Sequence, residues 1–332
     1  MHHKMKITGF RFSVTTLIFL LSSIGAFAQF MVLGAKGDNK VDGQPLKVGA
    51  LLQSNQTITI GNGAYLGLAH TSKKTIELNK AGTYKISDLE TKLAAADNDL
   101  TNRYADFVIN ELTSKDGNST RFNTGAKTGS VTRDVSKLPL LFAMPVDENG
   151  ISKTSKVLAD TKITIKWFVN NFDEVKEDEI QSYVFTVKDG SPDNIGNVIY
   201  ETNTSDKKVT IDLSDSKFKR NKTLIYQVEA VTKNGKKKIT SPEAMLQKLK
   251  SKENYLIAEE FNKLPQEETA INKLIKAKFF EEKGLIANAI NMYEEALAIS
   301  DVPQYSSYYS EFLNYYGLVK KESVTASTTT ED

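Results

Sequence analysis

The chain has 332 residues, with 43 Lys and Arg against 41 Asp and Glu, which gives a formal net charge of +2. This length predicts two or three domains of about 100 to 150 residues each, and the balance of charge argues against a whole-protein field that attracts nucleic acid or an anionic membrane. The chain has no cysteine, which excludes disulfides, Cys-ligated zinc, thiol catalysis and a lipid-bearing cysteine.

The N-terminal segment has the pattern of a secretory signal. Three basic residues precede an apolar or hydroxylated run at 14–24, and Ala-Phe-Ala follows at 26–28. This order is typical of a cleaved signal peptide, and the run is shorter than the roughly 20 residues that span a bilayer. We therefore expect removal of residues 1–28. The remaining chain is then close to neutral, has no transmembrane segment and is exported to the periplasm or outer cell surface of a Gram-negative bacterium.

Residues 29–113 are predicted to form a small β module and a following helix. Short apolar alternations broken by glycine turns run from 30 to 89, as in small antiparallel sheets, and three- and four-residue apolar steps then continue to Thr113. The β part resembles the FecR-like domain through G-x-x-L-x-x-G at Gly43, Leu46 and Gly49 and I-x-I-G-x-G-A-x-L-x-L from Ile58 to Leu68. The resemblance implies an extracytoplasmic module, best known for sensing and for passing signals to a membrane partner.

Residues 114–136 are rich in Gly, Ser, Thr and Asn, which is typical of a linker. Period-two alternation returns in residues 137–246 and predicts a β-sandwich. This segment resembles a fibronectin type III domain in the early core position of Trp167 and in the pattern that leads to the corner tyrosine, namely Leu213, Phe218, Tyr226, Val228 and Ala230. The resemblance implies a fold that many binding modules share, and it implies a buried Trp167.

Residues 247–320 are predicted to be helical. They resemble one tetratricopeptide repeat at its small, aromatic and turn positions, which are Ala277, Phe280, Gly284, Ala289, Tyr293 and Ala296. Small residues let two antiparallel helices approach while aromatic residues fill the gaps. One repeat cannot bury its own faces, so flanking helices at about 253–264 and 304–318 are expected to complete the unit. The Ser/Thr-rich tail, 321–332, is predicted to be disordered.

The predicted fold is multidomain, mainly β and then α, with a small β module, a fibronectin type III-like β-sandwich and a C-terminal helical repeat unit. His70 is the only histidine outside the signal, and we interpret it as an ordinary strand-end residue. The acidic run at 173–179 is interpreted as a solvated loop. Basic runs at 217–222 and 233–238 flank one strand at opposite ends, so they cannot form one patch. We expect no catalytic, cofactor-binding or metal site and no nucleic-acid partner.

The C-terminal aromatic residues are the candidate partner interface. Helical spacing places most of them on one face, and tyrosine is enriched at interfaces. The candidates are Tyr305, Tyr308, Tyr309, Tyr315 and Tyr316. Phe312 is predicted to face inward against the helix of Ala289 and Tyr293, which leaves Tyr308 and Tyr315 exposed. The alternative is that these aromatic residues only cover the helical repeat.

Two β modules and a helical repeat without a recognisable catalytic constellation favour one hypothesis: a non-enzymatic exported scaffold or adaptor that contacts protein or glycan in the cell envelope. The alternative is an extracytoplasmic FecR-like regulatory sensor that passes a signal to a membrane partner. A hydrolase that uses carboxylates alone also stays open, because acidic residues are plentiful.

Overall fold

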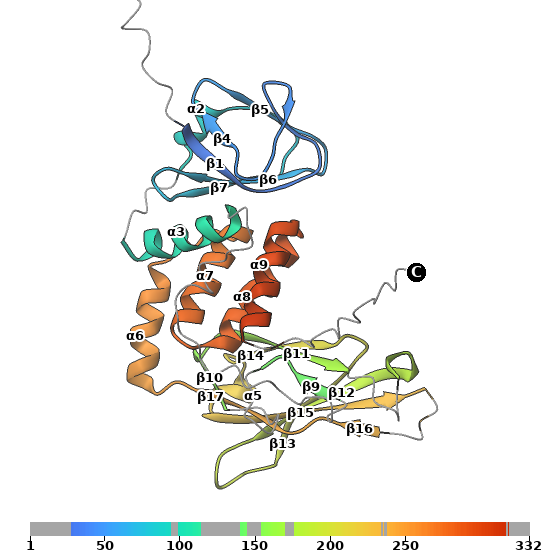
Figure 1. The fold of residues 1–332 in the computed structure, drawn as a ribbon. Coiled ribbons are helices and arrows are strands. Elements are labelled where there is room, and N and C mark those ends of the chain that lie inside the picture. Colours follow the sequence, from blue (N-terminus) through green and yellow to red (C-terminus); the bar gives the residue numbers. More distant parts are fainter. Residues whose placement is uncertain are drawn as a thin grey trace, which may run out of the picture.

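The computed structural model describes residues 28–93, 99–113, 140–144, 154–169, 176–233, 235, 238–316 and 318. The fold is mixed, with antiparallel sheets in the N-terminal two-thirds and helices in the C-terminal region (Figure 1). The predicted signal (1–27 of it), linker and tail lie outside the described residues. Among the helices that are described, none is long and apolar enough to cross a membrane.

The N-terminal β module consists of two four-stranded sheets. The first has the order β4 (Leu51–Gln53), β1 (Ala28–Lys36), β6 (Tyr65–His70) and β7 (Thr75–Leu78). The second has the order β3 (Gln44–Pro45), β2 (Asn39–Val41), β5 (Thr57–Ile60) and β8 (Gly82–Lys85). Asp42 and Gly43 turn the β2–β3 hairpin, and both have positive φ, 47° and 82°, as a tight hairpin of this kind requires.

Alternation along β1 and β6 gives the first sheet two buried faces. Phe30, Val32, Leu66 and Leu68 point into the core of the module, whereas Leu33, Tyr65 and Ala69 belong to a second, larger core outside it. A bulge between Val32 and Gly34 shifts the register of β1 against β6. Because successive side chains of a strand point to opposite faces, the module can contact the rest of the molecule through this outer face.

The helical stretch predicted from residue 88 to Thr113 is observed as two helices, the short α2 (Ile86–Glu90) and α3 (Asp99–Thr113), and residues 94–98 between them lie outside the described residues. The buried residues of α3 recur at helical spacing, at Tyr104, Ala105, Val108, Ile109 and Leu112. This stripe places α3 between the first sheet and the C-terminal helices.

The second β region is a sandwich. One sheet has the order β14 (Lys208–Asp212), β11 (Lys162–Val169) and β9 (Leu140–Phe142). The other has the order β10 (Ser155–Val157), β17 (Ala244–Lys248), β15 (Thr223–Thr232), β12 (Ile180–Asp189) and β13 (Val198–Thr204), with β16 (Lys238–Thr240) also paired to β15. Only the β10–β17 pair is parallel among these described strands. A 3-10 turn at Glu177–Glu179 and helix α5 (Ser216–Lys219) precede β12 and β15.

The predicted burial of Trp167 is confirmed. Its side chain is 1% exposed. Its ring stacks on Phe185 with 6.1 Å between centroids and meets the edge of Tyr183 at 5.4 Å. Trp167 belongs to the small sheet and its two partners to the large one, so this contact holds the two sheets together.

The predicted helices are observed as α6 (Ser251–Asn262), α7 (Ala270–Glu282), α8 (Ile286–Ile299) and α9 (Pro303–Tyr315). Gly284 turns the α7–α8 hairpin with φ +71°, and the amide of Leu285 donates to the carbonyl of Phe280. A left-handed glycine with this hydrogen bond is a common helix stop. Pro303 starts α9, where its missing N–H costs nothing.

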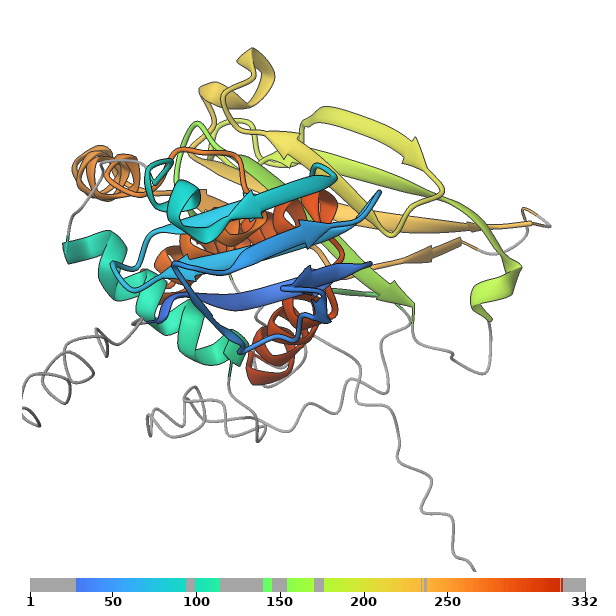
Figure 2. The same ribbon diagram turned by 90° about the horizontal axis from the view of Figure 1, so that it is seen from above.

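These C-terminal helices form the middle layer of the molecule (Figure 1). On one side α8 contacts β10 and β11 of the sandwich, and on the other α9 contacts β1, while α3 packs on α7. The view from above shows the first module lying over the helices (Figure 2). A single hydrophobic core therefore runs from Leu33 and Tyr65 through Phe279 and Tyr293 to Trp167.

We predict that Trp167→Ala lowers the free energy of unfolding by about 3–5 kcal/mol, because a large aromatic side chain is removed from a packed core. Urea denaturation followed by circular dichroism measures this loss. Trp167 is the only tryptophan, so the wild-type emission maximum should be blue-shifted. A solvent-like maximum in the folded protein would contradict the observed packing.

Candidate functional site at the junction of the β module and the helices

The structure buries three of the five tyrosines that were predicted to contact a partner. Tyr305, Tyr308 and Tyr309 are 0%, 2% and 4% exposed, so the prediction that they form a surface for another molecule is wrong, including that of an exposed Tyr308. The physical reason is that α9 is covered on more than one side, by α8, α3 and β1. Helical spacing groups the rings on one face, but it does not reveal that the partner belongs to the same chain.

The remaining aromatic residues of α9 follow the prediction more closely. Phe312 faces inward as predicted, since it is fully buried and its ring lies 4.8 Å from that of Tyr293 on α8. Tyr315 and Tyr316 are partly exposed, and their part in a partner interface stays a prediction.

The Tyr305 ring packs on the backbone of two glycines, Gly34 on β1 and Gly67 on β6. We call this surface, together with the neighbouring Tyr65, the tyrosine seat. A Cβ atom added at Gly34 would lie 3.0 Å from the Tyr305 ring, and one added at Gly67 would lie 2.5 Å from the Tyr305 hydroxyl. Glycine inside a strand often marks such a close approach. Gly67 lies between Leu66 and Leu68 on β6, and here it provides room for an aromatic side chain of α9.

A buried hydrogen-bond network links this seat to the start of α7. The hydroxyls of Tyr65 and Tyr305 lie 3.0 Å apart, and the Glu77 carboxylate of β7 accepts from the backbone N–H of Ile271 at 2.7 Å. Glu77 also interacts with the Tyr65 hydroxyl. The carboxylate therefore satisfies an N–H at the first turn of α7 that has no partner within the helix. A negative charge at this end of a helix also interacts favourably with the helix dipole.

Burial changes the proton affinity of each member of the network. Loss of water raises the pKa of both tyrosines above its usual value, so their hydroxyls stay protonated and can act as donors. Burial also raises the pKa of Glu77, although hydrogen bonds from Ile271, Tyr65 and Ala270 partly oppose this rise. Glu77 is consequently held by contacts within the protein on several sides.

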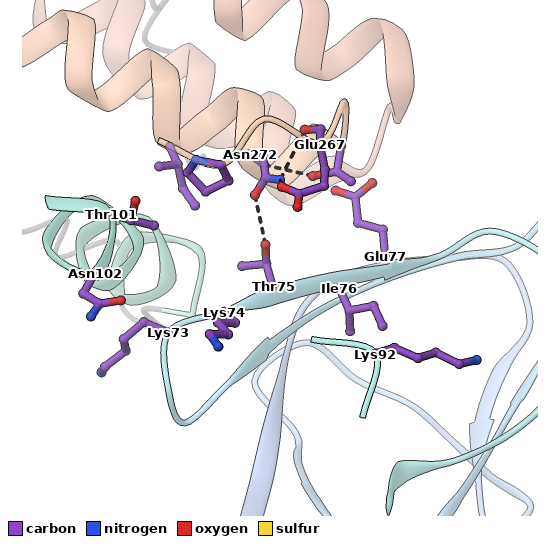
Figure 3. Close-up of a pocket in the computed structure, with 13 residues that line it drawn as sticks. Lys73, Lys74, Thr75, Ile76, Glu77, Lys92, Thr101, Asn102, Glu267 and Asn272 are labelled. Carbon is purple, nitrogen blue, oxygen red and sulfur yellow. Dashed lines mark hydrogen bonds between the residues drawn. The ribbon is translucent and has the colours of Figure 1, made fainter. Parts of the chain in front are cut away.

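A hollow of about 230 Å³ opens beside Glu77, between β7, the start of α3 and the loop before α7. Figure 3 shows Thr75 reaching from β7 toward Asn272 of α7, and the Thr75 hydroxyl donates to the Asn272 side-chain oxygen at 3.0 Å. The amide nitrogen of Asn272 donates in turn to Glu267. Polar groups around the hollow thus bind one another and hold the module to the helices.

The polar contacts at this junction connect the β module to the helices. Glu77 is engaged by the helix terminus and Tyr65, and the nearby Lys73 forms an ion pair with Asp106 of α3. Lys36 at the end of β1 likewise forms an ion pair with Asp301 before α9. In the described part of the chain, no group of three His, Cys, Asp or Glu residues could hold a metal ion.

The other candidate residues lie apart from the junction. His70 ends β6, and its Nδ1 lies 2.7 Å from the Ser72 hydroxyl. Within the acidic run, Glu177–Glu179 form the exposed turn before β12, while 170–175 lie outside the described residues. The described residues of the basic runs lie near the two ends of β15, at α5 and at the start of β16. No protein-family model and no curated protein matches this chain.

We predict that Gly67→Ala lowers the free energy of unfolding by about 1–3 kcal/mol, because the added methyl group overpacks the tyrosine seat. Chemical denaturation measures this loss. The single variant Tyr305→Phe serves as a control: it removes the hydroxyl but keeps the ring, and it should cost about 1 kcal/mol for the lost hydrogen bond. In the double variant the added methyl group occupies part of the space that the hydroxyl leaves. The double variant should therefore lose less unfolding free energy than the sum of the losses of the two single variants. Simple additivity would contradict the contact.

Glu77→Gln tests the buried carboxylate through the pH dependence of stability. A carboxyl group whose pKa is raised on folding above its ordinary value of 4.5 stabilises the fold most below that value, and this contribution is lost as pH rises through the raised pKa. Glutamine can still accept from Ile271 but does not titrate. We therefore expect Glu77→Gln to gain stability relative to wild type as the pH rises above 4.5, as measured by urea denaturation over a series of pH values. If the stability of Glu77→Gln relative to wild type stays constant or falls as the pH rises, the raised pKa of Glu77 is refuted.

Proposed function

We propose that the protein is a non-enzymatic exported scaffold or adaptor that contacts a protein or glycan in the cell envelope. The observation that carries this proposal is the position of the helices between the two β regions. Helix α8 packs on α7 and α9 and contacts the sandwich, while α9 contacts β1 of the N-terminal module. The resulting body is held together by buried side chains, and its open sheet surfaces are directed outward. A single packed core with exposed sheet faces is consistent with a protein that holds a partner in a fixed position.

The finer identities of the three parts belong to the same proposal. The strand order of the large sheet, β17-β15-β12-β13, opposite β9-β11-β14, supports a sandwich of the fibronectin type III-like class. The glycine-turned α7–α8 hairpin supports a tetratricopeptide-like unit, and the two small sheets support a FecR-like module. The apolar run and the Ala-Phe-Ala sequence support export.

The outer face of the large sheet is the contact surface that we propose. Val198, Lys188, Ile225 and Met245 lie in one row across four strands, and residues paired in this way share a face. Val198 is 58% and Met245 38% exposed. The next rows form a hollow lined by Val184 and by the polar residues Thr186, Glu201, Gln227, Glu229, Lys238 and Thr240. Apolar side chains beside polar ones are typical of a partner surface.

We predict that the double variant Val198→Glu, Met245→Glu reduces partner recovery at least about tenfold, because two charges replace exposed apolar side chains at the contact. The measurement is quantitative pull-down from envelope extracts after mild crosslinking. Stability should stay within about 1 kcal/mol of wild type, since both positions are exposed.

Leu51→Glu is the matched control, because Leu51 is 59% exposed on β4 of the other β region. It should leave partner recovery unchanged. Partner recovery with the double variant equal to that with the wild-type protein would refute the proposed surface. Recovery of an inner-membrane signalling protein that depends on the FecR-like module, and not on the large sheet, would favour a regulatory sensor over a scaffold.

A further inference from the structure

A second hollow lies between the helices and the small sheet of the sandwich. It has a volume of about 620 Å³ and is bounded by α6, α7, α8, the loop before α7 and the strands β11 and β14. Sites for small molecules have volumes of about 300–1,000 Å³. The loop before α7 borders this hollow and the one beside Glu77, but the two hollows have no lining residue in common.

Two lysines of α7 are buried at this hollow. Lys273 and Lys276 are 6% and 3% exposed, and a spacing of three residues places them on the same helix face, where like charges repel. Lys273 is fully paired, since its ammonium group lies 2.5 Å from a Glu268 oxygen and 2.6 Å from a Glu295 oxygen. These two ion pairs outweigh burial and raise the pKa of Lys273.

Lys276 is in a different position. Among the described residues, its nearest acidic oxygen is that of Glu268 at 3.9 Å, which is beyond hydrogen-bond distance. The ammonium group also lies 5.5 Å from the centre of the Phe261 ring. Burial, followed by repulsion from Lys273, lowers the pKa of Lys276. A buried cation is costly unless it is paired and hydrogen-bonded, so this group lacks a close anion.

The acidic residues around the hollow are already engaged. One oxygen of Glu295 binds Lys273, and the other accepts from the Asn291 amide at 2.7 Å. Glu268 binds Lys273 with one oxygen and is largely exposed to solvent. The carboxylates therefore neutralise Lys273, and Lys276 is the charged group of the pair that is left for a ligand.

Neutral groups complete the walls of the hollow. Asn288 donates to the Thr161 hydroxyl at 2.9 Å and accepts from the amide of Leu158, which fixes its orientation and leaves one amide hydrogen for another acceptor. The rings of Phe261 and Phe280 stack with 4.9 Å between centroids and provide an apolar surface beside the ammonium group.

We propose that this hollow binds a small organic acid, whose carboxylate pairs with the Lys276 ammonium group and whose apolar part lies against Phe261 and Phe280. The site goes beyond the proposed scaffold function and does not depend on it. A carboxylate supplies the hydrogen-bond acceptors that Lys276 lacks, and the aromatic wall selects an acid with a hydrocarbon body over inorganic anions.

Isothermal titration calorimetry of the full chain tests this proposal with three acids and their amides: benzoate, hexanoate and succinate, each against benzamide, hexanamide and succinamide. We expect at least one acid to bind ten or more times more tightly than its amide. In Lys276→Met this preference should fall to less than twofold. The variant should melt at the same or a higher temperature than wild type, because an apolar side chain of similar length replaces a buried charge.

Lys162→Met is the control, because Lys162 lines the same hollow but is exposed. It should keep the preference for the acid within twofold of wild type. The proposal is overturned if wild type prefers none of the acids over its amide, if Lys276→Met keeps the preference, or if Lys162→Met loses it equally. Binding of inorganic phosphate as tightly as the best acid would also overturn it, since the hollow would then be a general anion site.

Discussion

The Tyr305 ring packs on the backbone at Gly34 and Gly67, and this close approach determines how near α9 stands to the first sheet. Any side chain at either glycine would move the helix outward. The Tyr65–Tyr305 hydrogen bond and the Glu77 contact with the start of α7 depend on the same approach, because hydrogen bonds require separations near 3 Å. Because α7 packs on α8 and α8 contacts the sandwich, these two helices also fix the position of the module relative to the sandwich.

The middle layer is unusual in what it buries. Almost every residue of α7 is buried, including Lys273, Lys276, Lys278 and Glu281, although helices buried all round are normally apolar. The charges are accommodated by pairing, as between Lys278 and Glu281 at 3.8 Å, and by aromatic contact, since the Lys278 ammonium group lies 3.8 Å from the centre of the Phe107 ring of α3. Burial of both flanks makes α7 a shared part of two interfaces rather than a surface helix.

Local patterns predict the elements of this chain well but not their contacts. Alternation around Trp167 and helical spacing around Phe312 depend on neighbours in sequence, so the strand of Trp167, the helix of Phe312 and these two buried positions are predicted correctly. Burial of Tyr308 depends on elements far away in sequence, and the helical pattern carries no information about them. Two glycines inside predicted strands, Gly34 and Gly67, were the available signal. The pairing of Lys273 and the weaker pairing of Lys276 need side-chain geometry across three elements, which spacing does not provide.

The distance along the chain between the glycines and Tyr305 has a consequence for how the molecule is made. The tyrosine seat on the outer face of β1 and β6 stays empty until α9 has been synthesised, because Tyr305 follows the two glycines by more than 200 residues. Domains generally fold in the order of synthesis, so the first module would form early and carry an apolar, glycine-lined surface without its cover. Docking of the helices becomes a late step that closes a very long loop. A chain cut short before α9 would expose this surface permanently and become a target for proteases and chaperones.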